Sequence, residues 1–369
     1  MAKQSPLFDL HTSNGAVFEE RDGWLLPLHF GNSAAEYQAA RSAAGFIDLS
    51  HRGMLQFTGP DRLSYLQGLL SNDLTLLKPY AGQYATLLNQ QGKVLGDGRV
   101  LCSLNSFYLD FWEAIKDKIL AHLSRYLVAD EVEIADRTEG YGILSIQGPH
   151  SEALLSKLLG QAELSLQLLQ HAMVNLDNAM ICLVRDSHTG EDGFDLIIPK
   201  ADLITVAQRL TEIGKSFSAG WLGEEAQEIL RVEAGVPRYG IDVTEDNLVL
   251  ETGLDNHVSF NKGCYLGQEV VERIRSRGHV NKKLVGLSLK EKAAATRGDK
   301  IMAEDKVVGA VTSSIVSPAL GHAIALGYVQ RDYWHPGSHL GITGTRGSMS
   351  ATVTSIPFVK QKSAPNPGP

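Results

Sequence analysis

Met54–Asp61 reads MLQFTGPD, a run that predicts a strand ending in a Gly-Pro step. Leucines at 63, 66, 69 and 70 follow at helical spacing, and proline is favoured at the first position of a helix. The same phrase returns as ILSIQGPH in Ile143–His150, with leucines at 154, 155, 158 and 159. The Gly-Pro steps lie 148 − 59 = 89 residues apart. We interpret the pair as an internal repeat, which predicts two related α+β lobes.

The pattern around the two phrases divides the chain. Hairpins are predicted in each lobe, around the turns at 89–92 and 189–193, with helices near 113–127, 201–214 and 222–234. Beyond Lys283 the sequence changes to short β-like runs separated by glycines, which predicts a small β-barrel. We therefore expect lobes at 1–140 and 141–283, a barrel at 284–360, and a polar, proline-rich tail at 361–369 that is disordered.

Bulk composition is that of an ordinary globular protein, with 369 residues, 43% hydrophobic and 21% charged. This length predicts two or three domains. The net charge of −8 argues against a surface devoted to nucleic acid, with the basic stretch at 273–283 as the local exception. No window approaches the roughly 18 apolar residues that span a bilayer, and the first residues lack the features of a signal peptide. We expect a cytoplasmic protein.

The cysteine and histidine patterns exclude several kinds of site. Cys102, Cys182 and Cys264 are far apart and form no C-x-x-C pair, which argues against a disulfide framework or a cysteine-rich metal site. The H-E-x-x-H spacing and the phosphate-binding G-x-x-x-x-G-K-[ST] loop are both absent. The sequence therefore predicts no metal site and no nucleotide-driven chemistry.

Thr189–Phe194 reads TGEDGF and is the first stretch with a chemical interpretation. Glycine and aspartate are also what a plain hairpin turn requires, so a purely structural turn is one interpretation. In the other, Glu191 points into a cleft and accepts two parallel hydrogen bonds from a planar N–H/NH₂ edge. The pterin ring of folate presents such an edge.

Asp97 lies in a second stretch, Gly92–Gly98, which reads GKVLGDG. It is either a surface aspartate on a strand after a turn, or an acid close enough to folate nitrogens to orient or share a proton.

The third stretch, Asn261–Glu269, reads NKGCYLGQE and precedes a basic run. Two glycines before a predicted helix could expose backbone N–H groups as an anion site. Positive charge near Cys264 would lower the pKa of its thiol and favour the thiolate. The alternative is an inert buried cysteine beside a solvated helix. The basic run could also bind an acidic tail, such as folate polyglutamate, or an RNA backbone.

Four phrases, taken in order, look like the aminomethyltransferase of glycine cleavage, and over about residues 34–357 the chain resembles the folate-dependent T-protein/YgfZ superfamily. They are FIDLSHRG at 46–53, SND at 71–73, HTGEDGFD at 188–195 and LRVEAG at 230–235. The resemblance implies three lobes around a central folate channel, with tetrahydrofolate or a one-carbon derivative as cofactor. It also implies that Glu191 contacts the pterin, that Arg231 lies nearby, and that Tyr84 is a site tyrosine.

The third stretch is similar to the signature of the YgfZ-like branch. The matching residues are Lys262, Gly263, Cys264, Tyr265, Gly267, Gln268 and Glu269. Gly96-Asp97 stands where the aminomethyltransferases of glycine cleavage usually carry paired aspartates. On this basis we expect a tetrahydrofolate-binding protein that supports maturation or repair of iron–sulfur enzymes, including tRNA-modifying ones, with those clients or assembly factors as partners. Cys264 would then be a thiolate of the site.

The alternative is a folate-dependent aminomethyltransferase or demethylase that acts with an aminomethyl-carrying protein or a small amine. Asp97 would then be the catalytic acid. A pure interaction module with a vestigial pocket is the third hypothesis.

Overall fold

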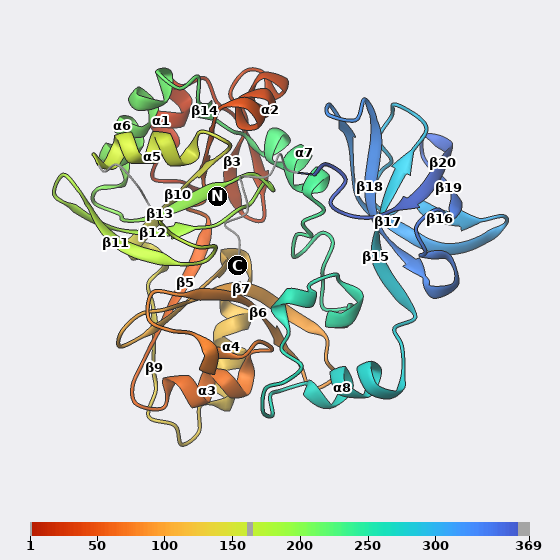
Figure 1. Cartoon of the computed structure of the whole chain (residues 1–369), viewed down its shortest axis with the longest axis horizontal. Coiled ribbons are helices and arrows are strands. Elements are labelled where there is room, and N and C mark those ends of the chain that lie inside the picture. The colour runs from red at the N-terminus through yellow and green to blue at the C-terminus, as the bar shows by residue number, and fades with distance from the viewer. Residues whose placement is uncertain (1, 161–164, 361–369) are drawn as a thin grey trace. The chain divides into compact units, whose positions relative to one another are not determined.

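The computed structural model describes residues 2–160 and 165–360, which form two compact units (Figure 1). Unit 1 comprises residues 1–227 and 256–268, and unit 2 comprises residues 228–255 and 269–369. The tail at 361–369, predicted to be disordered, lies outside the described residues.

The first lobe of unit 1 is a five-stranded sheet with helices on one face. Leu66 of α3 and Leu123 of α4 share a buried core with Val100 and Leu109 of the sheet. In sheet order the strands are β6 (Gly82–Leu88), β7 (Val94–Cys102), β8 (Phe107–Trp112), β5 (Arg52–Thr58) and β9 (Glu133–Asp136), and the helices are α3 (Arg62–Leu69) and α4 (Lys116–Tyr126).

The second lobe of unit 1 repeats this design. Leu154 and Leu158 of α5 and Leu210 of α6 pack with Ile146 and Leu196 of a six-stranded sheet. Its strands in order are β11 (His171–Leu176), β12 (Ala179–Arg185), β13 (Gly193–Pro199), β10 (Tyr141–Gln147), β4 (Gly45–Asp48) and β14 (Gly220–Trp221), and the helices are α5 (Ser151–Leu159) and α6 (Leu203–Lys215).

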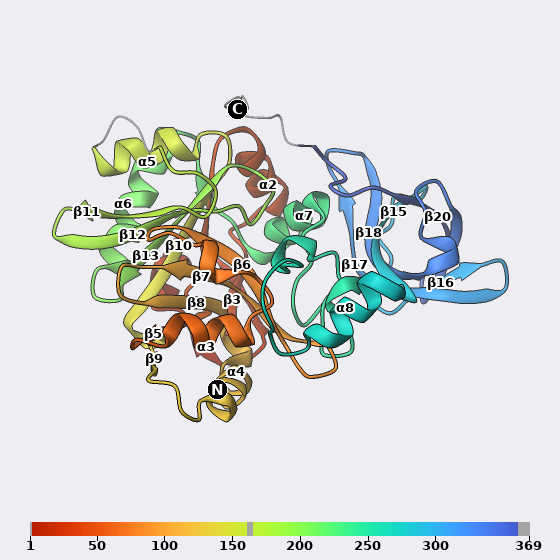
Figure 2. The ribbon, with the colours of Figure 1, turned by 60° about the horizontal axis from the view of Figure 1, so that its bottom comes forward.

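The prediction of two related lobes is confirmed by their topology. Strands β6-β7-β8-β5 and β11-β12-β13-β10 follow the same order, and the Gly-Pro step after β5 and after β10 leads into α3 and α5. Gly59 and Gly148 have φ of +102° and +133°, which a residue with a Cβ rarely adopts. In both views the helices lie on the outer sides of the two sheets (Figure 2).

The lobes also exchange a strand. Strand β4 precedes β5 in the chain but pairs with β10, whereas β9 precedes β10 and pairs with β5. A division of the chain at residue 140 therefore leaves β4 on the opposite side from the sheet to which it belongs. The predicted domain boundaries stay predictions.

A three-stranded sheet and two helices complete the N-terminal part of unit 1. The sheet order is β1-β3-β2, and Asn32 caps α2 by accepting hydrogen bonds from the backbone of Ala34 and Ala35. The elements are β1 (Lys3–Gln4), α1 (Phe8–Ser13), β2 (Val17–Arg21), β3 (Trp24–His29) and α2 (Ser33–Ser42).

Unit 2 contains the predicted C-terminal β-barrel, which the structure confirms as a closed ring in the order β15-β18-β17-β16-β19-β20. Closure leaves no strand edge unpaired. Helix α7 (Glu224–Ala234) begins in unit 1 and ends in unit 2, as does α8 (Gln268–Arg277). The strands are β15 (Lys282–Leu289), β16 (Lys300–Ala303), β17 (Lys306–Ser317), β18 (His322–Gln330), β19 (His339–Gly344) and β20 (Gly347–Thr354). Among residues 2–160 and 165–360, no helix is long and apolar enough to cross a membrane.

Candidate functional site

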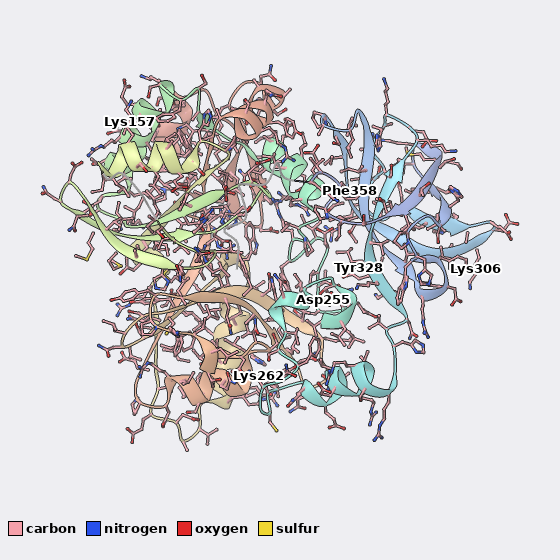
Figure 3. The ribbon with its side chains drawn as sticks, in the orientation of Figure 1. Lys157, Asp255, Lys262, Lys306, Tyr328 and Phe358 are labelled. Carbon is pink, nitrogen blue, oxygen red and sulfur yellow. The ribbon has the colours of Figure 1, made fainter. Side chains whose placement is uncertain are left out.

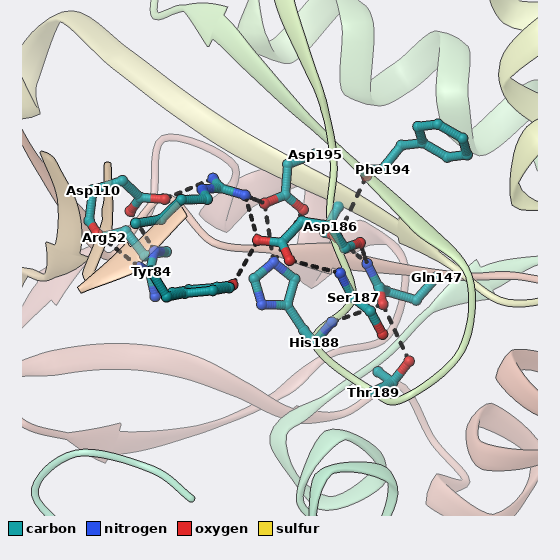
Figure 4. A network of polar contacts seen from close by, with 12 residues as sticks. Arg52, Tyr84, Asp110, Gln147, Asp186, Ser187, His188, Thr189, Phe194 and Asp195 are labelled. Atoms are coloured by element: carbon teal, nitrogen blue, oxygen red, sulfur yellow. Dashed lines mark hydrogen bonds and ion pairs between the residues drawn. The ribbon is translucent and has the colours of Figure 1, made fainter. Parts of the chain in front are cut away.

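The inner faces of the two sheets of unit 1 carry a network of charged side chains (Figure 4). Side chains alternate between the faces of a strand. Val100 and Cys102 of β7 therefore enter the core under α3 and α4, while Arg99 points the other way. Asp110 of β8 and Asp195 of β13 occupy the same kind of position and both bind Arg99. The inner faces therefore hold a buried polar network, whereas the outer faces hold the apolar cores under the helices.

Arg99 is the centre of this network and is only 1% exposed. One terminal nitrogen lies 2.6 Å from Asp186 Oδ2 and 2.6 Å from Asp195 Oδ2, and the other lies 2.6 Å from Asp110 Oδ2. Burial disfavours the guanidinium, but the carboxylates around it outweigh burial and raise the pKa of Arg99 well above its usual value. Arg52 donates to the other oxygen of Asp110 at 2.5 Å.

Tyr84 connects β6 to this network. Its hydroxyl donates to Asp186 Oδ2 at 2.6 Å, and its ring stacks on His257 with centroids 4.9 Å apart and planes 10° apart. Burial and the neighbouring Asp186 charge together raise the pKa of Tyr84 well above its ordinary value. Burial alone lowers the pKa of His257 to about 4, so at neutral pH an uncharged imidazole lies against a protonated phenol.

His188 begins the turn that carries Glu191. Its Nε2 lies 3.0 and 3.1 Å from the two oxygens of Asp195. Burial opposes the charged imidazole, but the charge and hydrogen bond of Asp195 prevail and raise the pKa of His188. The same contacts, with Arg99, lower the pKa of Asp195 below its ordinary value, although burial acts in the opposite direction.

Glu191, predicted to bind the pterin edge, forms an ion pair with Arg41 of α2, and both side chains are 14% exposed. Arg41 is itself held by Tyr37, whose hydroxyl accepts a hydrogen bond from Nε at 3.3 Å. The turn is fixed by the Ser187 hydroxyl, which donates to the Glu191 carbonyl at 2.6 Å. The carboxylate therefore sits on a turn held by hydrogen bonds and is paired with a guanidinium, and its contact with a pterin stays a prediction.

Asp97 lies on the inner face of β7, two residues before Arg99 and opposite Thr86 of β6. Burial raises the pKa of its carboxyl, against the opposing charge of Arg52. A carboxylic acid with a raised pKa keeps its proton to higher pH, which suits it to general acid chemistry.

Asp186, His188 and Asp195 place their ligand atoms within 4.8 Å of one another, as a metal site would. Arg99, however, already donates to both carboxylates. The guanidinium supplies the positive charge that a metal ion would otherwise bring, so these residues fit a buried ion cluster better than a metal site.

Arg231 lies in unit 2 and uses all of its N–H groups on neighbours within that unit. Nε and one terminal nitrogen hold both oxygens of Glu228 at 2.7 and 2.5 Å. The remaining donations go to the Val236 carbonyl at 3.0 Å, Asp242 at 2.7 Å and the Ser313 hydroxyl of β17 at 2.6 Å. These contacts fasten the end of α7 to the barrel strand, and a role for Arg231 in folate binding stays a prediction.

The loop at 261–269 is anchored on the first lobe by Lys262 (labelled in Figure 3), which is buried. It donates to the carbonyls of Gln67, Leu70 and Asn72 at 2.7, 2.6 and 2.8 Å, around the C-terminal end of α3. Burial lowers the pKa of Lys262 to about 8, and the nearby Asp73 partly compensates.

Other residues of the same loop also have positioning tasks. Gly267 has φ of +85°, and a Cβ there would lie 2.5 Å from the carbonyl oxygen of Asn89. Gln268 accepts a hydrogen bond from the backbone of Tyr265, which is buried. Cys264 is exposed, as is Glu269, which pairs with Arg273 at 3.8 Å within α8. A thiolate role for Cys264 stays a prediction.

Tyr84, Asp97 and the turn of Glu191 all lie in unit 1, and Tyr84 is linked to that turn through Asp186 and Ser187. Sequence reasoning did not single out Arg99, Asp110 or Asp186. The sequence feature that could have indicated them is a single charged residue within an otherwise apolar strand or at its end. The GRVLC run at 98–102 is an example.

Residues 7–262 match the family model described as the GCVT N-terminal domain, and residues 282–360 match the one described as the glycine cleavage T-protein C-terminal barrel domain. The chain belongs to the glycine cleavage T-protein family. It is 33% identical over 366 residues to the aminomethyltransferase of Thermosynechococcus vestitus, covering 97% of this chain and 96% of that protein. Over 328 residues it is 33% identical to the aminomethyltransferase of Rubrobacter xylanophilus, covering 89% of this chain and 87% of that protein.

A solved T-protein has the same fold. The crystal structure of glycine cleavage system aminomethyltransferase T from Bartonella henselae superimposes with a TM-score of 0.91 at 27% identity, covering 98% of this chain and 99% of that one. The T-protein side of the predicted resemblance is therefore confirmed. These relatives are all named aminomethyltransferase, which is the alternative function considered above. They give no support to the YgfZ-like branch.

Proposed function

We propose that this protein is a tetrahydrofolate-dependent aminomethyltransferase of the glycine cleavage type, which takes a one-carbon unit from an aminomethyl-carrying protein. The observation that carries the proposal is Asp97, an acid with a raised pKa on the inner face of the lobe that also holds Tyr84. Family membership supports it, because this chain aligns with nearly the whole length of the aminomethyltransferases of Thermosynechococcus vestitus and Bartonella henselae.

The residues of unit 1 fit a reduced folate by the chemistry of their donors and acceptors. We infer that the Glu191 carboxylate, which pairs with Arg41, also accepts from the pterin N–H edge, while Tyr84 offers a hydroxyl and Asp97 offers an acid. Tetrahydrofolate, when bound, supplies two N–H nitrogens that accept the one-carbon unit.

The transfer needs no oxidant or reductant, because only bonds to carbon and protons are exchanged. The methylene carbon exchanges its bonds to the carrier and to its amine nitrogen for two bonds to folate nitrogens. The two folate N–H protons pass to the carrier and to the departing ammonia. Asp97 can hold one of these protons in transit, because burial keeps its carboxyl protonated to higher pH than an exposed aspartate.

The test is steady-state kinetics of Asp97→Asn with tetrahydrofolate and an aminomethyl-loaded carrier protein. Asparagine preserves the shape but cannot exchange a proton, so kcat falls about 10²- to 10⁴-fold while tetrahydrofolate affinity is retained. Glu152→Gln, on the exposed face of α5, is the matched control and leaves kcat unchanged. An Asp97→Asn enzyme with normal kcat would remove the acid role.

One observation supports a second proposal, that the protein also maintains iron–sulfur enzymes, including tRNA-modifying ones. Cys264 presents an exposed thiol in the loop that resembles the YgfZ signature. This proposal predicts that Cys264→Ser lowers iron–sulfur enzyme activity in cells lacking the native protein, while folate affinity survives. Unchanged activity in those cells would withdraw it. The cytoplasmic setting that both functions assume stays a prediction.

A further inference from the structure

The hydroxyl of Tyr84 donates its hydrogen bond to Asp186. Asp186 is 2% exposed and collects donors on both of its oxygens. Oδ2 accepts from Tyr84 and from Arg99, each at 2.6 Å, and Oδ1 accepts from the backbone N–H of Ser187 at 2.8 Å. An ionised carboxylate accepts hydrogen bonds and cannot donate them, so the proton in the contact between Tyr84 and Asp186 belongs to the tyrosine.

Two further contacts keep this arrangement in place. The ring of Tyr84 is stacked on His257, which limits rotation of the phenol. Asp186 is fixed by Arg99, which Asp110 and Asp195 hold from two other strands. With its proton committed, the Tyr84 oxygen has only lone pairs left for a ligand.

We propose that Asp186, held by Arg99, is a positioning residue that makes the Tyr84 hydroxyl an obligatory acceptor for a ring N–H of the bound folate. The inference rests on the proposed function and deepens it by assigning the basis of substrate selection. A tetrahydropteridine ring carries N–H groups where the fully oxidised ring carries nitrogen lone pairs. An oxygen that can only accept therefore favours the reduced ring and repels the oxidised one.

A double-mutant cycle on ligand affinity tests the inference, with tetrahydrofolate and folic acid as the probes under anaerobic conditions. The parent protein binds tetrahydrofolate at least about tenfold more tightly than folic acid, and Tyr84→Phe loses about tenfold for tetrahydrofolate. Asp186→Asn loses a similar factor. The double variant loses no more than either single variant, because Asp186 acts through Tyr84.

Two outcomes of the cycle overturn the inference. One is an unchanged tetrahydrofolate affinity in Asp186→Asn. The other is a loss from Asp186→Asn that is as large in the Tyr84→Phe background as in the parent, which a purely structural role would give. A parent protein that binds no tetrahydrofolate would instead refute the proposed function, and with it this inference.

A second measurement covers the case in which Asp186→Asn does not fold. Replacing Tyr84 with 3-fluorotyrosine keeps the shape of the ring but makes its hydroxyl a stronger donor and a weaker acceptor. If Tyr84 accepts from the ligand, tetrahydrofolate binds more weakly to the fluorinated protein. Tighter binding would show that Tyr84 donates to the ligand and would overturn the inference.

Discussion

Replacing Arg99 with methionine should destabilise unit 1 more than any single surface change. The guanidinium pairs with Asp110, Asp186 and Asp195, which are at most 2% exposed. Removing one partner of a buried ion pair typically costs about 3–5 kcal/mol, because the remaining charge is left uncompensated. In a domain of roughly 150–250 residues, each kcal/mol shifts Tm by about 2–4 °C, so a loss of about 10 °C is expected.

The assay is urea denaturation of the parent and Arg99→Met proteins at pH 8 and pH 5. Without Arg99, burial raises the pKa of the stranded carboxyls above their values in the unfolded chain. A group with a raised folded-state pKa regains stability as pH falls, so the variant's deficit should shrink at pH 5. Arg209→Met is the matched control, because Arg209 and Asp177 form an exposed pair, 38% and 63% accessible, worth about 0–1 kcal/mol. A deficit below about 1 kcal/mol for Arg99→Met would show that Arg99 does not compensate the buried carboxylates.

Three further predictions concern the anchored loop and two buried histidines. Gly267→Ala should cost about 1–3 kcal/mol in unfolding free energy because of its positive φ and blocked Cβ position, whereas Gly263→Ala, with open space around it, should be neutral. Lys262→Met should leave three carbonyls without a donor and speed hydrogen exchange across residues 256–268; unchanged exchange would count against the anchor. His171 and His257 both have a pKa lowered to about 4 by burial, with a nearby arginine adding to the effect at His171. Stability should therefore fall between pH 6.5 and 4 as the unfolded state takes up protons first, and a double glutamine variant should flatten that dependence.

The sequence predicted the architecture because its signals were local. The Gly-Pro steps at 59 and 148 mark strand-to-helix turns that only a few residues can form, and their repetition revealed the two lobes. The exchange of β4 and β9 between the sheets could not be predicted, because strand pairing over about a hundred residues leaves no trace in short-range periodicity.

The sequence predicted candidate residues for the site, but it did not predict the side chains that contact them. Tyr84, Asp97 and Glu191 share unit 1, but the charges that organise them come from Arg99 and Asp186, which a pattern of hydrophobicity assigns to a solvated face. In the loop resembling the YgfZ signature, conformational and anchoring tasks account for Lys262 and Gly267. These tasks concern other residues of the motif, so the chemical role of the exposed Cys264 thiol stays a prediction.

Aminomethyl transfer can be followed through the transferred carbon itself. A carrier protein loaded with a ¹³C-labelled aminomethyl group is mixed with tetrahydrofolate and the purified chain, and the folate product is analysed by mass spectrometry and NMR. The label should appear in a methylene bridge between two folate nitrogens, with one equivalent of ammonia released for each carbon transferred. Label that stays on the carrier, with a folded enzyme that binds tetrahydrofolate, would contradict the proposed function.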